Sequence, residues 1–418
     1  RELPEIRKPK KPRKYMVNDS IEGWADSVKI LMKSYFTGSY IPIYDFSQIR
    51  PRGSPLVTSG GRAPGPDPLR VCLEKIQESL NMKADGDKLT PIECHDILTI
   101  IADAVLSGGI RRASLISLFS IDDEDMLNCK SYLDVELKSY IGYNSQFKSH
   151  EIEIAHHHLV KTIFLSEPEY ETFIKDGKIA WYYLYPERAR SNNSMVVHRN
   201  LITKSVFDEK WDVIKNSGSG EPAFWLTNDI EHGCNPCGEA SLRPHTFCNL
   251  CTINSSTIES QEDFENRVRV AAFIGTLQAS YTDFHYLRYI WKEHTEKDAL
   301  LGISLTGIAS NRLSTLDIEK ASRVSLAEND RVARIIGINT AARITLLKPE
   351  GTGSLVLGTS SGIHTWYSKY YIRRLRVNKN EPIYPYLKEK LPNLVEDETI
   401  GSGAIISIPM KAPDGAIT

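Results

Sequence analysis

The sequence predicts an α/β fold, and three features of its 418 residues support that prediction. Segments with apolar residues at helical spacing alternate with short β-branched runs along most of the chain. Loops rich in glycine and proline separate these segments. The hydrophobic share of 41% is ordinary for a globular protein, and the chain is long enough to bury a large core.

The N-terminal third of the chain contains three predicted helices and two predicted strands. The apolar spacing of residues 19–38 predicts a helix, whose first turn Asp19 or Ser20 can cap. Residues 41–70 predict a short strand and then a loop that glycine and proline keep irregular. The elements that follow are helices at 66–80 and 90–109 and a buried strand at 111–122.

The composition changes at residues 131–177, which are rich in aromatic residues, histidine and charge. We expect this segment to form a separate element at the surface. Beyond it, the pattern predicts a strand–loop–strand unit at 181–197, helices at 206–218 and 258–284, and a helix, a strand and a glycine-rich loop at 333–366.

Charge and hydropathy exclude several classes of protein. Lys and Arg number 51 and Asp and Glu 53, so the chain lacks the positive field of a nonspecific nucleic-acid binder. No apolar run approaches the roughly 18 residues that a membrane helix needs. The basic start has no apolar stretch like that of a secretory signal, which favours a cytoplasmic protein. Because the chain starts with Arg and stops inside ordinary sequence, we expect a fragment.

Four of the seven cysteines crowd into one short stretch of the chain. Cys234, Cys237, Cys248 and Cys251 have the spacing C-x2-C-x10-C-x2-C. Spacing alone matches a structural zinc site with four thiolate ligands. An odd cysteine count without a secretory signal also favours cysteines kept for chemistry or metal binding in a reducing compartment.

A second pattern in the same stretch favours chemistry other than zinc binding. Asn235, Cys237 and Glu239 alternate, so an extended segment would place amide, thiol and carboxylate on one face. The carboxylate can act as a general base on a substrate hydroxyl, and the amide can hold that hydroxyl by hydrogen bonding. A zinc site with four thiolates requires neither group.

The run Asn-Pro-Cys-Gly-Glu at 235–239, followed by Cys-Asn-Leu at 248–250, resembles the active-site signature of ribonucleotide reductases. The resemblance implies that Cys237 forms the thiyl radical that removes the 3′ hydrogen of the ribose. It makes Glu239 the base for the 3′ hydroxyl and Asn235 the hydrogen-bonding partner of that hydroxyl. Cys248 would be one of two thiols that reduce the 2′ position, whereas Cys234 and Cys251 would be buried small apolar residues.

Residues 348–354 and 358–364 form a loop rich in small and hydroxyl-bearing residues. Such a loop can direct backbone N–H groups at phosphate oxygens, although taken alone the pattern favours a plain turn. In this context it resembles the reductase loop that holds the substrate phosphates. That resemblance assigns phosphate contacts to Gly351, Thr352, Gly353 and Ser354, and the sequence 358–377 favours the adenosylcobalamin-dependent branch.

Two polar loops resemble the reductase loops that sense the allosteric nucleotide and contact the substrate, although solvated turns explain them equally well. The residues concerned are Arg111, Arg112, Arg188, Asn192, Asn193 and Ser194. The loop at 49–66 also resembles this branch and would be structural, near the cobalamin or the substrate rim. The tract 156–158 has three consecutive histidines, which we interpret as an exposed patch rather than a metal site because adjacent residues cannot all face one ion.

The resemblance as a whole implies a ten-stranded α/β barrel with a central finger loop that buries Cys237. The chain would be one catalytic barrel over residues 1–418, incomplete at both ends, with an insertion at 131–177. Its reaction would be the reduction of ribonucleotides, as triphosphates, to 2′-deoxyribonucleotides. The cofactor would be adenosylcobalamin, the reductant a thioredoxin-like dithiol and the effector a nucleotide. The second thiol of the pair with Cys248, and a C-terminal cysteine pair, are expected outside the chain.

Three other interpretations stay open. The first is a reductase with a separate metal-radical subunit, although Tyr370-Tyr371 directly follows the phosphate loop and does not match the paired tyrosines of that class. The second is a zinc-binding module that recognises nucleic acid or protein. The third is a degenerate reductase fragment with a structural or regulatory role.

Overall fold

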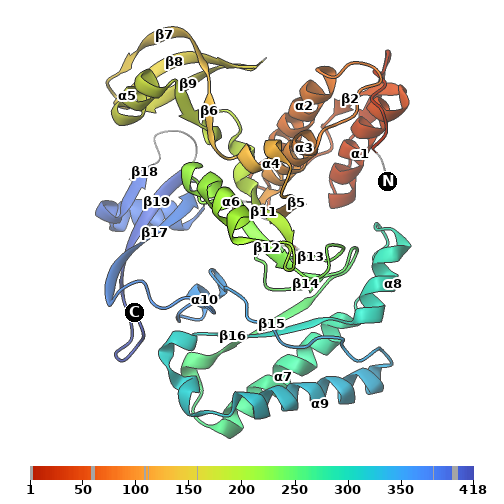
Figure 1. The fold of residues 1–418 in the computed structure, drawn as a ribbon, viewed down its shortest axis with the longest axis vertical. Helices are drawn as coiled ribbons and strands as arrows, with labels where there is room; N and C mark the ends of the chain where they lie inside the picture. The colour runs from red at the N-terminus through yellow and green to blue at the C-terminus, as the bar shows by residue number, and fades with distance from the viewer. Residues whose placement is uncertain are drawn as a thin grey trace. The chain divides into compact units, whose positions relative to one another are not determined.

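The structure, a computed structural model, describes residues 3–57, 62–107, 110–111, 113–157, 159–379, 381–397 and 403–418. Helices and strands alternate along these residues, which confirms the predicted α/β class. The chain forms two compact units (Figure 1). The first unit comprises Arg1–Asn228 and Arg376–Ile406, and the second comprises Asp229–Leu375 and Ser407–Thr418.

The first unit begins with a β–α–β element. β1 (Lys11–Met16) and β2 (Tyr40–Asp45) pair in parallel and are joined by α1 (Ile21–Thr37). Ser20 caps α1 by accepting a hydrogen bond from the Gly23 N–H, as predicted. Packed with this element are α2 (Asp67–Asn81) and α3 (Pro91–Ala104). The core here consists of large apolar side chains, including Ile6, Leu31, Tyr35, Leu69, Ile76 and Leu80.

Three parallel strands form the central sheet of the first unit. They are β5 (Leu115–Ser120), β11 (Ser191–His198) and β12 (Ala223–Thr227), in the order β12-β11-β5. α6 (Lys204–Asn216) connects β11 to β12, and α4 (Glu124–Asn128) follows β5. The short hairpin of β3 (Leu106–Ser107) and β4 (Ile110–Arg111) follows α3, so the helix predicted to reach residue 109 ends earlier.

Residues 181–190 differ from their prediction. The sequence predicted a strand and then a loop here, whereas the structure has two 3-10 helices, η1 (Trp181–Tyr183) and η2 (Pro186–Arg190). The Trp181 carbonyl accepts hydrogen bonds from the N–H groups of both Leu184 and Tyr185, which turns the chain instead of extending it. The aromatic residues favoured a strand by propensity, but these local hydrogen bonds form helical turns instead.

The segment with distinct composition folds around a small core of its own. It contains an antiparallel sheet of β7 (Glu136–Asn144), β8 (Ser149–His156) and β9 (Leu159–Ser166), followed by α5 (Glu167–Asp176). β6 (Tyr132–Asp134) pairs with β10 (Lys178–Ala180), so the element closes a few residues beyond the predicted boundary. Its core side chains include Ile152, Ile154, Ile163, Leu165, Phe173 and Ile179. The element thus has a core of its own, and its being an insertion stays a prediction.

The second unit is built on a parallel strand pair covered by helices. β15 (Asn249–Asn254) pairs with β16 (Leu301–Thr306), and Ile303 bridges in parallel to Thr345. α7 (Gln261–Ala279) packs against both strands and against α9 (Ile318–Ile336), as Figure 1 shows. The remaining elements are β13 (Gly233–Cys234), β14 (Ser241–Leu242), η3 (Ser255–Thr257), α8 (Tyr289–Asp298), η4 (Ile308–Ser310), η5 (Arg312–Thr315) and α10 (Gly353–Val356).

The C-terminal residues form a three-stranded sheet and a short helix. The sheet has the order β17-β19-β18, with β17 (Tyr370–Asn378), β18 (Val395–Asp397) and β19 (Gly403–Lys411). α11 (Ile383–Lys390) and η6 (Pro392–Leu394) lie between β17 and β18 in the chain. β18 pairs antiparallel with β19.

The closed barrel is the part of the expected fold that the structure does not show. A barrel requires each strand to pair on both sides. Among the described residues the strands instead form separate sheets of two or three strands, and β5, β12 and β15 each have one neighbouring strand. Each unit does contain the parallel pairing that an α/β barrel uses. In the described residues no helix is both long and apolar enough to span a bilayer.

Candidate functional site

A tight hairpin in the second unit carries the residues of the cysteine motif. Cys234 of β13 lies opposite Ser241 of β14. Within the turn, the Asn235 side-chain oxygen accepts the Ala240 N–H at 3.0 Å, and the Asn235 carbonyl accepts the Gly238 N–H at 2.9 Å. Gly238 has φ 81°, a conformation that glycine adopts without strain. The local sequence thus makes a turn with Cys237 at its tip.

The Cys237 thiol is exposed, although we expected a barrel to bury it. The hairpin has only two paired positions, so its tip extends beyond the last strand pair. Within the described residues of this unit, no third strand pairs with β13 or β14. Burial of the thiol would therefore require a covering surface beyond the hairpin itself.

Glu239 holds the most unusual polar group of the hairpin. Both of its carboxylate oxygens are buried, and neither has a hydrogen-bond partner among the described residues. Most buried polar atoms are paired, so an unpaired buried carboxylate needs an explanation. A ligand hydroxyl is one partner that would satisfy it.

The Glu239 carboxylate acts on two of the neighbouring thiols. Burial and Glu239 together raise the pKa of the Cys234 thiol to about 11. Burial and Glu239 also raise the pKa of the Cys248 thiol, whereas the Lys348 ammonium opposes that rise. The charges of Glu239 in the hairpin and of Lys348 before the phosphate loop thus both act on the Cys248 thiol. The second unit brings these two motifs together, although they are about a hundred residues apart.

Cys251 is set apart from the other thiols of the motif. It lies in β15, and its thiol donates a 3.7 Å hydrogen bond to Gln278 of α7. A Cβ built on Gly275 of the same helix would lie 3.6 Å from its sulfur. Across the described residues, which include all seven cysteines, no three His, Cys, Asp or Glu side chains are grouped to hold a metal. The four-thiolate zinc arrangement is therefore not the geometry of this stretch.

The predicted phosphate loop begins with a buried carboxylate. Glu350 precedes Gly351 and is only 7% exposed, and its side chain accepts a hydrogen bond from Thr252 of β15. The Lys348 ammonium lies 3.5 Å from the same carboxylate. Ser354 is buried, and its hydroxyl donates to the Gly351 carbonyl at 3.5 Å. The sequence identified the loop but not Lys348, Glu350 or Thr252 as its supporting residues.

The polar loop before β11 is held inside the first unit. Arg188 is 4% exposed and forms a two-pronged ion pair with Asp96 of α3, with both N–O distances 2.7 Å. Its Nη1 donates to the Cys129 carbonyl at 2.8 Å, and its guanidinium lies 3.9 Å from the centre of the Tyr185 ring. Arg188, which we expected to contact a nucleotide, thus has its donors engaged by the protein interior.

The three residues assigned to substrate contact lie in β11 and differ in exposure. Asn192 is exposed, whereas Asn193 and Ser194 are buried. Asn193 donates from its amide to the Cys129 sulfur at 3.0 Å. Of the first polar loop, Arg111 belongs to β4, and Arg112 lies outside the described residues.

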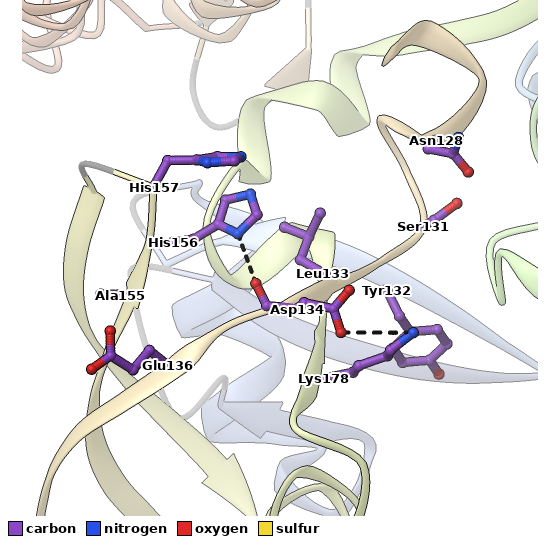
Figure 2. Close-up of a pocket in the computed structure, with 10 residues that line it drawn as sticks. All are labelled: Asn128, Ser131, Tyr132, Leu133, Asp134, Glu136, Ala155, His156, His157 and Lys178. Carbon is purple, nitrogen blue, oxygen red and sulfur yellow. Dashed lines mark hydrogen bonds and ion pairs between the residues drawn. The ribbon is translucent and has the colours of Figure 1, made fainter. Parts of the chain in front are cut away.

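The histidine tract borders a cavity of about 650 Å³ in the inserted element (Figure 2). His156 Nδ1 lies 2.8 Å from the Asp134 carbonyl, and Lys178 pairs with the Asp134 carboxylate at 3.7 Å. The His156 and His157 rings are 4.2 Å apart, while His158 lies outside the described residues. The expected exposed patch thus lines a hollow, which no periodicity in the sequence indicated.

Comparison with curated proteins confirms the resemblance that the motifs suggested. The chain is 25% identical over 416 residues to a probable adenosylcobalamin-dependent ribonucleoside-triphosphate reductase of Dictyostelium discoideum, covering 96% of this chain and 48% of that protein. It is 28% identical over 396 residues to an adenosylcobalamin-dependent ribonucleoside-triphosphate reductase of Euglena gracilis, covering 88% and 46%. The enzyme of the same name from Lactobacillus leichmannii is 26% identical, with 95% and 54% covered.

The chain spans about half the length of the curated relatives it matches. No family model matches it. Among solved structures, the crystal structure of a B-12 dependent (class II) ribonucleotide reductase superimposes with a TM-score of 0.65 at 22% identity. That match covers 96% of this chain and 55% of the other, and it shows a shared fold.

Proposed function

From this similarity to adenosylcobalamin-dependent ribonucleoside-triphosphate reductases, we propose that the chain carries the substrate-reducing site of such an enzyme. The observation that carries the proposal is the Glu239 carboxylate, buried and without a hydrogen-bond partner among the described residues, beside the thiols of Cys234 and Cys248. A carboxylate close to two thiols suits a site at which thiols give up hydrogen and the carboxylate takes a proton from a sugar hydroxyl.

Each group of the hairpin has a role in this proposal. The Cys237 sulfur, as a thiyl radical, takes the hydrogen atom from C3′ of the ribose. Glu239 accepts the proton of the 3′ hydroxyl, and the NH₂ group of Asn235 orients that hydroxyl, since the Asn235 oxygen is engaged within the turn. Two thiols then supply two electrons and two protons and become a disulfide, while the 2′ hydroxyl leaves as water. Cys248 is one of them, and the motifs assign no second thiol within this chain. Glu239 returns its proton to the 3′ oxygen, and the Cys237 thiol returns a hydrogen atom to C3′ and is again a thiyl radical.

The phosphate end of the substrate would meet residues 351–354. Gly351, Thr352 and Gly353 are small or hydroxyl-bearing residues at the start of α10, and Lys348 adds a positive charge nearby. Backbone N–H groups and one cation are a suitable set of partners for a triphosphate. Within the first unit, the exposed side chain of Asn192 would contribute to recognition of the nucleotide effector, whereas Arg188 is buried.

Adenosylcobalamin, which the relatives' names contain, supplies when bound the radical that a thiol requires. The described residues fit this cofactor at Cys237, because the thiol at the exposed hairpin tip is accessible to a bulky group. Cys237 would face the cofactor, and Glu239 and Asn235 would face the sugar. A nucleotide effector and a thioredoxin-like reductant complete the proposal, with a cytoplasmic setting whose reducing conditions keep these thiols reduced.

The test is reduction of CTP to dCTP by the protein that contains this chain, with a dithiol present and with or without adenosylcobalamin. We expect product only with the cofactor. Cys237→Ala should abolish it, and Glu239→Gln should lower kcat by about a hundredfold while CTP still binds. Cys251→Ala is the matched control, because that thiol packs on α7, and it should retain activity.

Two results would contradict the proposal. Activity that survives Cys237→Ala would remove the radical thiol, and activity without cobalamin would remove the cofactor assignment. One tightly held zinc per chain, lost in Cys251→Ser, would favour a zinc module instead.

A further inference from the structure

Glu350 adopts a backbone conformation that residues with a side chain seldom use. Its φ is 54°, in the left-handed region, and its carboxylate points into the second unit instead of into solvent. Such a conformation is unfavourable for a non-glycine residue unless neighbouring contacts hold it. Specific contacts must therefore hold Glu350 in this conformation.

The contacts of Glu350 come from the strand pair and from its own loop. The Thr252 hydroxyl, on β15, donates to Glu350 Oε1, and the Lys348 ammonium lies 3.5 Å from the same oxygen. The Lys348 N–H in turn donates to Ser304 of β16 at 2.8 Å. Thr252 and Ser304 are opposite each other in the β15–β16 register. A series of polar contacts, in which Glu350 and Ser304 are buried and Thr252 and Lys348 half-buried, thus connects the start of the loop to both strands.

Two glycines leave the space that this arrangement requires. A Cβ built on Gly353 would lie 2.1 Å from Glu350 Oε2, so a side chain at 353 would displace the carboxylate. A Cβ built on Gly362 would lie 1.9 Å from the Lys348 carbonyl. Glycine at 353 therefore has a packing reason besides any contact with phosphate. The carboxylate lies directly beneath the residues assigned to phosphate binding.

We propose that Glu350 is a positioning residue, whose buried carboxylate ties the phosphate loop to β15 through the Thr252 hydroxyl. This inference rests on the proposed function. Cys248 directly precedes β15, and Thr252 is the fourth residue of that strand. The hydrogen bond between Thr252 and Glu350 therefore fixes the position of the loop relative to the Cys248 thiol. A ribonucleoside triphosphate that orders the loop would then also restrain Cys248. Lys348 contributes to the same link, since its charge acts on both Glu350 and Cys248.

The experiment measures how CTP binding changes the reactivity of Cys248. Iodoacetamide labelling at Cys248 is followed by mass spectrometry with and without CTP, and CTP affinity is measured separately by calorimetry. In the unchanged protein we expect CTP to slow labelling of Cys248 about tenfold. In Thr252→Val and Glu350→Ala we expect CTP to bind, with less than twofold slowing. Thr252→Ser keeps the hydroxyl and should retain the protection.

A matched control removes a similar bond elsewhere in the same unit. Thr282 donates to Glu296 at 2.7 Å at the surface, so Thr282→Val should leave the protection of Cys248 intact. If CTP binds and protects Cys248 equally well in Thr252→Val and Glu350→Ala, the tie does not act as proposed. Loss of protection in Thr252→Ser would equally overturn it. Failure of the unchanged protein to bind CTP would instead reject the proposed function, and the inference with it.

Discussion

Replacing Asp96 by alanine should destabilise the first unit by about 3–5 kcal/mol, because the Arg188 guanidinium would stay buried without its anionic partner. The Arg188 side chain is 5% exposed, so water cannot replace the carboxylate. Both of its bonds to Asp96 measure 2.7 Å, and hydrogen bonds of charged groups contribute about 1.5–3 kcal/mol each. The remaining partners, the Cys129 carbonyl and the Tyr185 ring, are neutral and cannot compensate the charge.

Urea unfolding followed by circular dichroism measures this loss as a shift of the midpoint. Because the chain has two units, hydrogen exchange of peptides covering 91–104 and 186–198 would assign the loss to the first unit. Asp208→Ala is the matched control, since Asp208 pairs with Lys204 at the exposed surface and should contribute about 0.3–0.5 kcal/mol.

The double variant Asp96→Leu with Arg188→Met provides a second check. It removes both charges and keeps their volume, so it should be more stable than Asp96→Ala alone. If Asp96→Ala loses less than about 1 kcal/mol, or no more than the surface control, the pair does not stabilise this loop and the reasoning from burial fails.

Two further predictions concern the second unit. Gly353→Ala should lower the free energy of unfolding by about 1–3 kcal/mol in urea, because its Cβ would meet the Glu350 carboxylate. Gly351→Ala is the control and should be tolerated, since nothing lies within 4 Å of its Cβ. Equal losses in the two variants would contradict this packing. With its pKa raised to about 11, the Cys234 thiol should react with iodoacetamide at pH 8 about a hundredfold more slowly than a thiol of pKa 9. Glu239→Gln should lower that pKa and speed labelling at the same pH, and an unchanged rate would show that the carboxylate does not act on the thiol.

Local elements were the part of the fold that sequence reasoning predicted well. The helix at Ile21–Thr37 begins after its Ser20 cap and ends at Gly38, because caps and apolar spacing are short-range features. The errors arose where local hydrogen bonds competed with propensity, as at Trp181–Tyr183, which forms a 3-10 helix rather than a strand. The barrel came from the resemblance, and strand pairing among the described residues does not form it.

The candidate site likewise has features that the sequence predicted and features that it did not. The alternation of Asn235, Cys237 and Glu239 predicted an extended segment with amide, thiol and carboxylate on one face, whereas the structure forms a turn closed by the Gly238 N–H and the Asn235 carbonyl. Nothing in the spacing indicated that the Glu239 oxygens would be buried without a partner, or that Cys237 would be exposed. Solvent exposure depends on what packs over a turn, and a turn's own residues do not encode it.

By itself the sequence determined the helix at Ile21–Thr37 with its caps, the cysteine motif and the glycine-rich loop, since each depends on residues within a few positions of one another. Tertiary structure alone decided that Arg188 is neutralised by Asp96, 92 positions away, and that Thr252 meets Glu350 across 98 positions. Such contacts arise when separate elements pack, and a charge's nearest neighbour in space has no fixed distance from it along the chain. The assignment of Arg188 to the interior and of Glu350 to the phosphate loop follows from that packing.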